Sequence, residues 1–109
     1  MIHMLSAFNL KPGEDYEQFR KAYAEFVADI LDAGIIESAG PLGHRVPNTP
    51  MDTDDRDQKC FSVMSFRDRQ QLDAAYVHIE RRMRPATATH LDMYRRITNS
   101  VFLCWEDEN

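Results

Sequence analysis

Residues 59–76, KCFSVMSFRDRQQLDAAY, decide most of the fold because one stretch contains a strand, a helix start and a helix. The segment 59–66 is short and apolar, which is typical of a β-strand. One face of that strand holds Phe61 and Val63, and the other holds Cys60, Met64 and Phe66. Asp68 follows as an N-cap, with Gln71 three residues later as in a capping box. The stretch therefore predicts a strand buried on both faces that leads directly into a helix.

The same signals extend outward along the chain. The expected elements are, in order, a strand at 2–10, a helix at 16–33, an irregular edge strand at 35–46, a strand at 59–66, a helix from 68 to Met83 stopped by Pro85, a helical segment from 86 to about 97, and a strand at 100–106. This order is β-α-β-β-α-β with an extra helical segment before the last strand, as in ferredoxin-like proteins. We predict one α+β domain over 1–109, with a four-stranded antiparallel sheet and the helices on one face.

The sheet is expected to be apolar on both faces. The last strand places Val101, Leu103 and Trp105 on one face and Phe102 and Cys104 on the other, and the first strand opposes Leu5 and Ala7 to Ile2, Met4, Phe8 and Leu10. The helices can cover only one of these faces. A second copy of the sheet is the simplest cover for the other, so we predict a homodimer with sheets packed face to face.

Composition excludes several function classes. The 109 residues carry a formal net charge of −5, which argues against nucleic acid as a partner because phosphate binding needs a basic surface. No apolar run is long enough to span a membrane, and 1–10 lacks the pattern of a signal peptide. Cys60 and Cys104 form neither a disulfide framework nor a metal-binding pair. We expect a cytoplasmic protein with reduced thiols.

Over nearly its whole length the chain resembles the dimeric α+β barrel superfamily. The segments that carry the resemblance are MIHMLSAFNLKPG at 1–13, DYEQF at 15–19, the stretch 59–76 and NSVFLCWED at 99–107. The chain is most similar to a bacterial branch without assigned function, related to stress-responsive barrel proteins. The resemblance implies a ligand cleft between sheet and helices, and activities such as cofactor-free monooxygenase, polyketide cyclase or lactone isomerase. No motif matches one enzyme's catalytic set, so only the location of the cleft carries over.

Three polar side chains are the candidate catalytic residues. His3 shares one face of the first strand with Asn9, and each is either satisfied structurally or lines a pocket. If a pocket is present, His3 could act as a general base, and Asn9 could bind a ligand. His90 and Tyr94 lie one helical turn apart and could point into the cleft as an acid/base and hydrogen-bonding pair, or be a core tyrosine and its satisfied neighbour.

His44 and Arg45 are the remaining ligand-binding candidates, since they follow the edge strand and could bind an anion at the mouth of a cleft. The alternative is an ordinary surface pair. The four histidines lack zinc-site spacing, and we predict neither a metal nor another cofactor.

Two functional hypotheses remain open. The first is a homodimer that binds a small aromatic or polyketide-like molecule between sheet and helices, with or without catalysis. The second is a non-catalytic structural or stress-related dimer without a ligand. The two hypotheses differ in the space under the helices. If Phe8, Phe26, Tyr76 and Trp105 fill that space, no ligand fits, whereas a cavity of several hundred Å³ with convergent polar groups favours binding.

Overall fold

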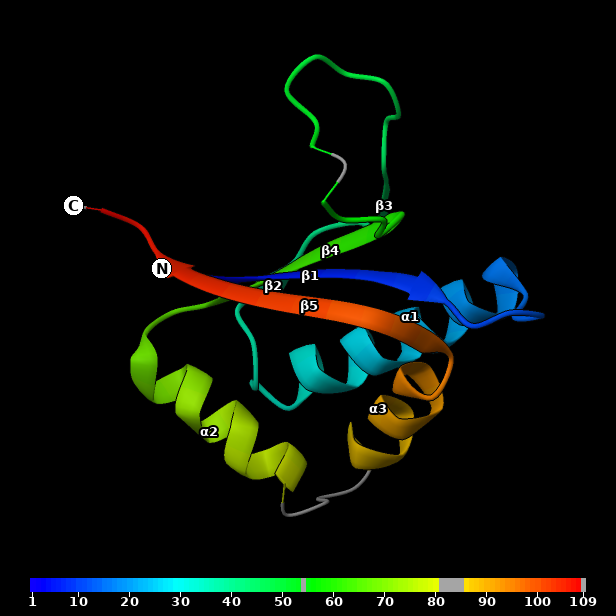
Figure 1. Ribbon diagram of the computed structural model, residues 1–109. Coiled ribbons are helices and arrows are strands. Elements are labelled where there is room, and N and C mark those ends of the chain that lie inside the picture. The colour runs from blue at the N-terminus through cyan, green and yellow to red at the C-terminus, as the bar shows by residue number, and fades with distance from the viewer. Residues whose placement is uncertain (54, 81–85, 109) are drawn as a thin grey trace.

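The computed structural model describes residues 1–53, 55–80 and 86–108. Its elements, labelled in Figure 1, are β1 (Ile2–Leu10), α1 (Tyr16–Asp32), β2 (Ser38–Ala39), β3 (Gly43–His44), β4 (Cys60–Phe66), α2 (Arg69–Glu80), α3 (Ala86–Tyr94) and β5 (Ile97–Glu106). The predicted end of the second helix at Met83 and its stop at Pro85 lie outside the described residues. The predicted order of strands and helices, with a helical segment before the last strand, is confirmed.

The strands form one antiparallel sheet in the order β2-β4-β1-β5, and β3 also pairs with β4. The segment 38–44 is therefore a single edge strand that is interrupted between Ala39 and Gly43. Pro41 lies in the interruption, and an edge is where a residue without an N–H group does least harm to a sheet. The irregular edge strand expected from the sequence is confirmed.

The helix α1 forms the floor of the core. Its N-cap is Asp15, whose side chain accepts a hydrogen bond from the Glu17 backbone N–H at 2.8 Å. Gly34, with φ of +71°, follows the helix in the left-handed conformation that glycine adopts without strain. The apolar stripe of the helix is buried and consists of Phe19, Ala22, Tyr23, Phe26 and Ile30.

The start of α2 is tied to the end of α1 by Gln71, a buried amide. Asp68 caps the helix by accepting from the Gln71 backbone N–H at 2.9 Å, while the Gln71 side chain accepts from the Arg67 backbone N–H. The same amide donates to the Gly34 carbonyl at 3.1 Å. One side chain thus satisfies two backbone groups at this corner.

The boundary between α3 and β5 differs from the prediction. The helix was expected to run to about Ile97, but it ends at Tyr94, and Ile97 pairs with Leu10 in the sheet. The pairing of β1 with β5 shifts register between Ala7 and Asn9 at a bulge, where Asn99 has a positive φ of 55°. The bulge lets the strand continue past a polar interruption, so the strand starts earlier than its apolar run.

The helices α1, α2 and α3 lie on the same side of the sheet, and the described part of the loop between β3 and β4 extends away from them (Figure 1). The predicted layer arrangement is confirmed. Among the described residues, no helix is long and apolar enough to cross a membrane.

Candidate functional site: a cavity between the sheet and the helices

The sheet presents side chains to the helices in rows across its strands. The register aligns Met64, Met4 and Cys104 in one row and Ser62, Ser6 and Phe102 in the next. Phe8 and Cys60 form the row beyond. The two serines are small side chains in the middle of a face of large ones, so they leave the sheet hollow at its centre.

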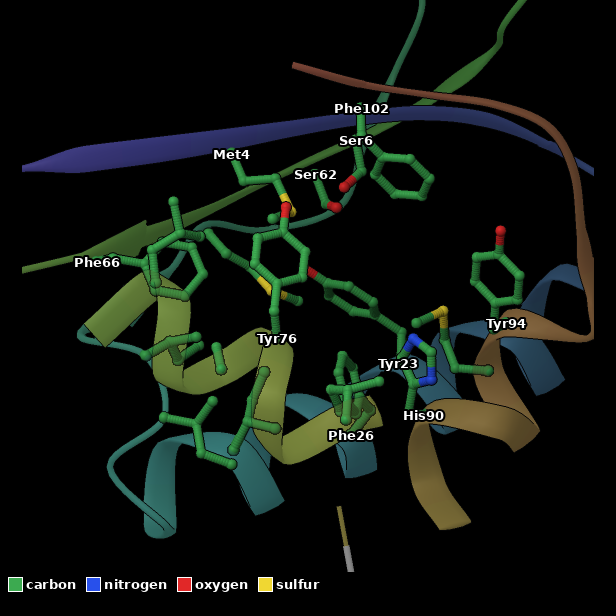
Figure 2. Close-up of a pocket in the computed structure, with 18 of the residues that line it drawn as sticks. Met4, Ser6, Tyr23, Phe26, Ser62, Phe66, Tyr76, His90, Tyr94 and Phe102 are labelled. Carbon is green, nitrogen blue, oxygen red and sulfur yellow. The ribbon is translucent and has the colours of Figure 1, made fainter. Parts of the chain in front are cut away.

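A cavity of about 380 Å³ lies beneath this hollow, within the range of small-molecule sites. Figure 2 shows Met4, Ser6, Ser62 and Phe102 on the sheet side, and Tyr76, Phe26, His90 and Tyr94 from the helices around the space. Phe8, Phe26 and Tyr76 form part of its wall without closing it, and Trp105 lies on the opposite face of the sheet. The space under the helices is therefore open.

The cavity wall is mainly apolar, and its polar groups are uncharged. None of the described lining residues is an aspartate, glutamate, lysine or arginine. The polar side chains are Ser6, Ser62, Tyr23, Tyr76, Tyr94 and His90. In a low-dielectric space without countercharges, an ionised ligand loses hydration without compensation. The lining therefore fits an uncharged ligand.

His90 projects from α3 between two aromatic rings. Its ring centroid lies 5.3 Å from that of Phe26 and 5.4 Å from that of Tyr94, and the planes of His90 and Tyr94 are within 20° of parallel. Burial lowers the pKa of the His90 imidazole below its usual value. The side chain is therefore neutral at pH 7 and can accept a proton. The structure brings His90 and Tyr94 together at the cavity, as their spacing predicts.

The mouth of the cavity lies between α2, α3 and the edge strand β5. Three aromatic side chains mark it, because Tyr76, Tyr94 and Phe102 are lining residues that remain between 43% and 49% exposed. Burial raises the pKa of the Tyr76 hydroxyl, and its contact with Cys104 raises it further. Exposed aromatic rings beside an apolar cavity provide a surface on which a planar ligand can stack on entry.

His3 lies on the other face of the sheet and is not brought together with His90 and Tyr94. Its Nδ1 lies 2.7 Å from the Ser65 hydroxyl, and its Nε2 lies 3.0 Å from both carboxylate oxygens of Asp107. The Trp105 ring packs against the His3 ring, with ring centroids 5.1 Å apart. The face with Ile2 and Phe8 packs on the helices, so His3 lies outside the cavity between the sheet and the helices. A catalytic role for His3 stays a prediction.

Asn9 also faces away from the helices and joins the end of the sheet to the long loop. Its side chain accepts from the Lys59 backbone N–H at 2.9 Å and donates to Asp57 at 3.3 Å. Asp57 also accepts from Asn99 at the β5 bulge, at 2.5 Å. These hydrogen bonds hold the loop against the end of the sheet. The predicted contact of Asn9 with a ligand stays a prediction.

Arg45 lies in the 45–59 loop and holds parts of it together through hydrogen bonds. Its guanidinium pairs with Asp52 at 2.6 Å and 2.9 Å and donates to the backbone carbonyls of Thr53 and Arg56. The guanidinium lowers the pKa of the Asp52 carboxyl. The His44 ring packs against the Tyr16 ring at a tilt of 55°, with ring centroids 4.9 Å apart. Both residues line a shallow surface hollow beside the loop, separate from the cavity under the helices, and their anion-binding role stays a prediction.

The face of the sheet opposite the helices is apolar as well. Its rows are Val63, Leu5 and Leu103, then Phe61, Ala7 and Val101, with Trp105 at the end beside His3. Leu103 is 54% exposed and Trp105 is 46% exposed. We call this set of side chains the open face. Large exposed apolar side chains clustered on one face are typical of an interaction surface.

Solved structures share this architecture. The chain superposes on a protein of Arabidopsis thaliana with a TM-score of 0.75 at 11% identity, covering 100% of this chain and 97% of that one. The chain has the ferredoxin-like fold. A protein described as dimeric, ferredoxin-like and of unknown function, from Thermobifida fusca, matches with a TM-score of 0.63 at 10% identity over 95% and 88% of the two chains.

A further match is a protein described by a family name. A Mesorhizobium loti protein, described as a dabb family protein with a ferredoxin-like fold, has a TM-score of 0.53 at 15% identity over 99% and 97% of the two chains. Searches against protein-family models and against curated proteins find no match. At these identities the likeness concerns the fold, and it agrees with the ferredoxin-like fold that the sequence predicts.

Sequence reasoning did not identify four polar residues of the cavity as site candidates: Ser6, Ser62, Tyr23 and Tyr76, the last of which it named only as a side chain that could fill the space. A signal was present for the serines, because each is a single polar residue on the strand face that otherwise carries large apolar side chains. No signal marked the tyrosines, since both belong to apolar helical stripes. Their role in the cavity depends on where the helices cross the sheet.

Proposed function

We propose that this protein binds a small, uncharged aromatic or polyketide-like molecule in the cavity between the sheet and the helices. The observation that carries the proposal is the cavity itself, about 380 Å³ in volume, with aromatic walls and without a described ionised lining residue. Its three rim aromatics, Tyr76, Tyr94 and Phe102, provide an entry for a planar molecule. The competing hypothesis, a structural dimer without a ligand, requires no such space.

We propose further that the protein is a homodimer joined through the open face. Leu103 and Trp105 are about half exposed in one chain, and a two-fold axis would let the same patch cover itself on both subunits. The structural neighbours described as dimeric support a dimer. The helices and the cavity then lie on the outer side of each sheet, so each subunit would hold a complete site.

The binding proposal is tested with two neighbouring alanines of α2. Ala75 lines the cavity, whereas Ala74 is exposed to solvent. Calorimetric titration with 1-naphthol should show binding to the natural protein and to the Ala74→Leu variant. The Ala75→Leu variant should bind on the order of tenfold more weakly, because the added isobutyl group occupies ligand volume. Equal affinities for both variants, or no binding to the natural protein, would refute the proposal.

A second candidate function, proton transfer by His90, is favoured by its neutral imidazole at the cavity. The imidazole would remove a proton from a carbon next to a ligand carbonyl, and the electron pair of the C–H bond would move to the carbonyl oxygen to form an enolate. Returning the proton reverses the step. The same enolate is the starting point for cyclase, isomerase or oxygenase chemistry, and Tyr94 would position the ring by stacking.

Deuterium exchange tests this step without identifying the natural substrate. In D₂O the protein should speed the loss of the C2 protons of 1-tetralone, followed by NMR. The rate should fall at least about 100-fold in His90→Gln, the order expected for loss of a general base, and less in Tyr94→Phe. Because the His90 pKa is lowered, the rate should stay constant down to pH 6.5 and fall below it. Exchange that survives in His90→Gln would exclude this role.

A further inference from the structure

The Tyr23 hydroxyl is a buried polar group that the fold does not satisfy. Tyr23 is 7% exposed, and its hydroxyl makes no hydrogen bond of standard geometry with the described residues. Such a group typically costs about 1–3 kcal/mol, so its presence needs an explanation. Burial raises the pKa of this hydroxyl, which therefore remains a protonated donor over the whole physiological range.

A polar group beside Tyr23 lies on the sheet side of the cavity. The Ser62 hydroxyl lies close enough to Tyr23 to lower its pKa in part. Ser62 is paired directly with Ser6 across β4 and β1, and both side chains face the cavity. Figure 2 shows the two serine hydroxyls side by side on the sheet, with Tyr23 rising toward them from α1. Three uncharged hydroxyls thus gather on one part of a mainly apolar cavity wall.

We propose that these hydroxyls form a carbonyl site, in which Ser6 and Ser62 donate to a ketone or quinone oxygen of the ligand and Tyr23 positions Ser62. A carbonyl oxygen has two lone pairs and accepts two hydrogen bonds, which matches two adjacent serines. Tyr23 donates to the Ser62 oxygen and so turns the serine proton toward the ligand. The chain of bonds satisfies the buried tyrosine and strengthens the serine donor. This inference rests on the proposed binding function and adds the ligand's chemical class.

The site also discriminates against charged ligands. A carboxylate at the same position would receive only neutral donors, and no described lining residue carries a positive charge. Its desolvation would outweigh hydrogen bonds of ordinary strength. A hydrocarbon of the same shape would bind only through contacts of its rings and would accept no hydrogen bond from the serine hydroxyls.

Three related probes separate these contributions in calorimetric titrations: 1-tetralone, tetralin, which lacks the carbonyl, and 1-naphthoate, which is an anion. The natural protein should bind 1-tetralone on the order of tenfold more tightly than tetralin, and 1-naphthoate most weakly. Ser62→Ala should remove most of the preference for 1-tetralone, and Tyr23→Phe should reduce it about three- to fivefold. Neither change should alter tetralin binding by more than about twofold.

Ser65→Ala is the matched control, because Ser65 lies on the same strand but faces the open face. It should leave the preference for 1-tetralone unchanged. Infrared spectra of bound 1-tetralone give a second readout, since the carbonyl band should move to higher frequency in Ser62→Ala. If tetralin and 1-tetralone bind equally, or both variants retain the preference, the carbonyl site is refuted while the binding function stands. If no probe binds, the binding function fails first.

Discussion

The two faces of the sheet consist of the same strands but differ in what they leave open. The helix-side face carries large apolar side chains around two central serines, and the helices arch over the resulting cavity. The open face has no such gap at its centre, where Leu5 lies between Val63 and Leu103. One face is thus covered by the helices and hollow in the middle, and the other is continuous and uncovered.

The proposed functions of the two faces follow from this difference: ligand binding on the helix side and dimer formation through the open face. A hollow needs a molecule of limited size, whereas a continuous apolar surface needs a surface of matching extent. The alternation of a β-strand makes such a division possible, because adjacent residues face opposite ways and can change independently. Substitutions on one face should therefore leave the task of the other face intact.

The largest expected effect is on stability, at the helix-side face. Phe26 is 6% exposed and joins the core cluster with Ile2, Ile30 and Phe66. Phe26→Ala should lower the free energy of unfolding by about 3 kcal/mol, as is usual for a buried phenylalanine. The control Phe102→Ala, at the exposed mouth, should cost less than about 1 kcal/mol. Urea unfolding measures both, and similar losses for the two variants would mean that the mouth is part of the core.

The next effect concerns the open face. Leu103→Asp places a charge on a side chain that is 54% exposed in one chain, so the fold should tolerate it. In a face-to-face dimer the same charge would be buried, and dimer dissociation should increase on the order of 100-fold. Sedimentation equilibrium should show dimers for the natural protein and monomers for the variant.

A control for the open face comes from α3. Leu91 is 50% exposed on the helix side, so Leu91→Asp should leave the dimer unchanged. A monomeric natural protein, or dissociation caused equally by Leu91→Asp, would contradict the proposed interface. Binding of 1-naphthol by the monomeric Leu103→Asp variant would show that each subunit holds a complete site.

The smallest expected effect is a pH dependence of stability from His90. Because burial lowers its pKa in the folded state, the unfolded chain binds the proton more readily. The resulting stabilisation is present above pH 6.5 and is lost as the pH falls through the lower, folded-state pKa. Melting temperatures measured from pH 7.5 to pH 5.5 should therefore fall less in His90→Gln than in the natural protein. A parallel fall in both would show that His90 is not desolvated.

Much of the fold could be predicted because local signals agree with each other. Asp15 and Gly34 bound the first helix, and the apolar alternation of Cys60–Phe66 places its side chains on the faces where they lie. The prediction that the third helix runs to about Ile97 was wrong, because Ile97 instead pairs with Leu10, a residue 87 positions away, next to a bulge. No local pattern contains that information.

The site was harder to predict, since it depends on register and on helix placement. Ser6 and Ser62 create a hollow only because the strands align them side by side, and a shift of one residue would separate them. His90 and Tyr94 were identified because their spacing is a local property of a helix. His3 could not be placed relative to that cleft, because the sequence alone does not say which apolar face the helices cover.

The central claim is that the hollow on the helix side, and no other surface, receives the ligand. Methionine methyl groups report on this directly, since Met4, Met64 and Met93 line the cavity while Met1 and Met51 are exposed outside it. In a protein labelled with ¹³C at the methionine methyls, bound 1-tetralone should show nuclear Overhauser effects to Met4, Met64 and Met93 and none to Met1 or Met51. Contacts to Met1 or Met51 without contacts to the three cavity methionines would contradict the account.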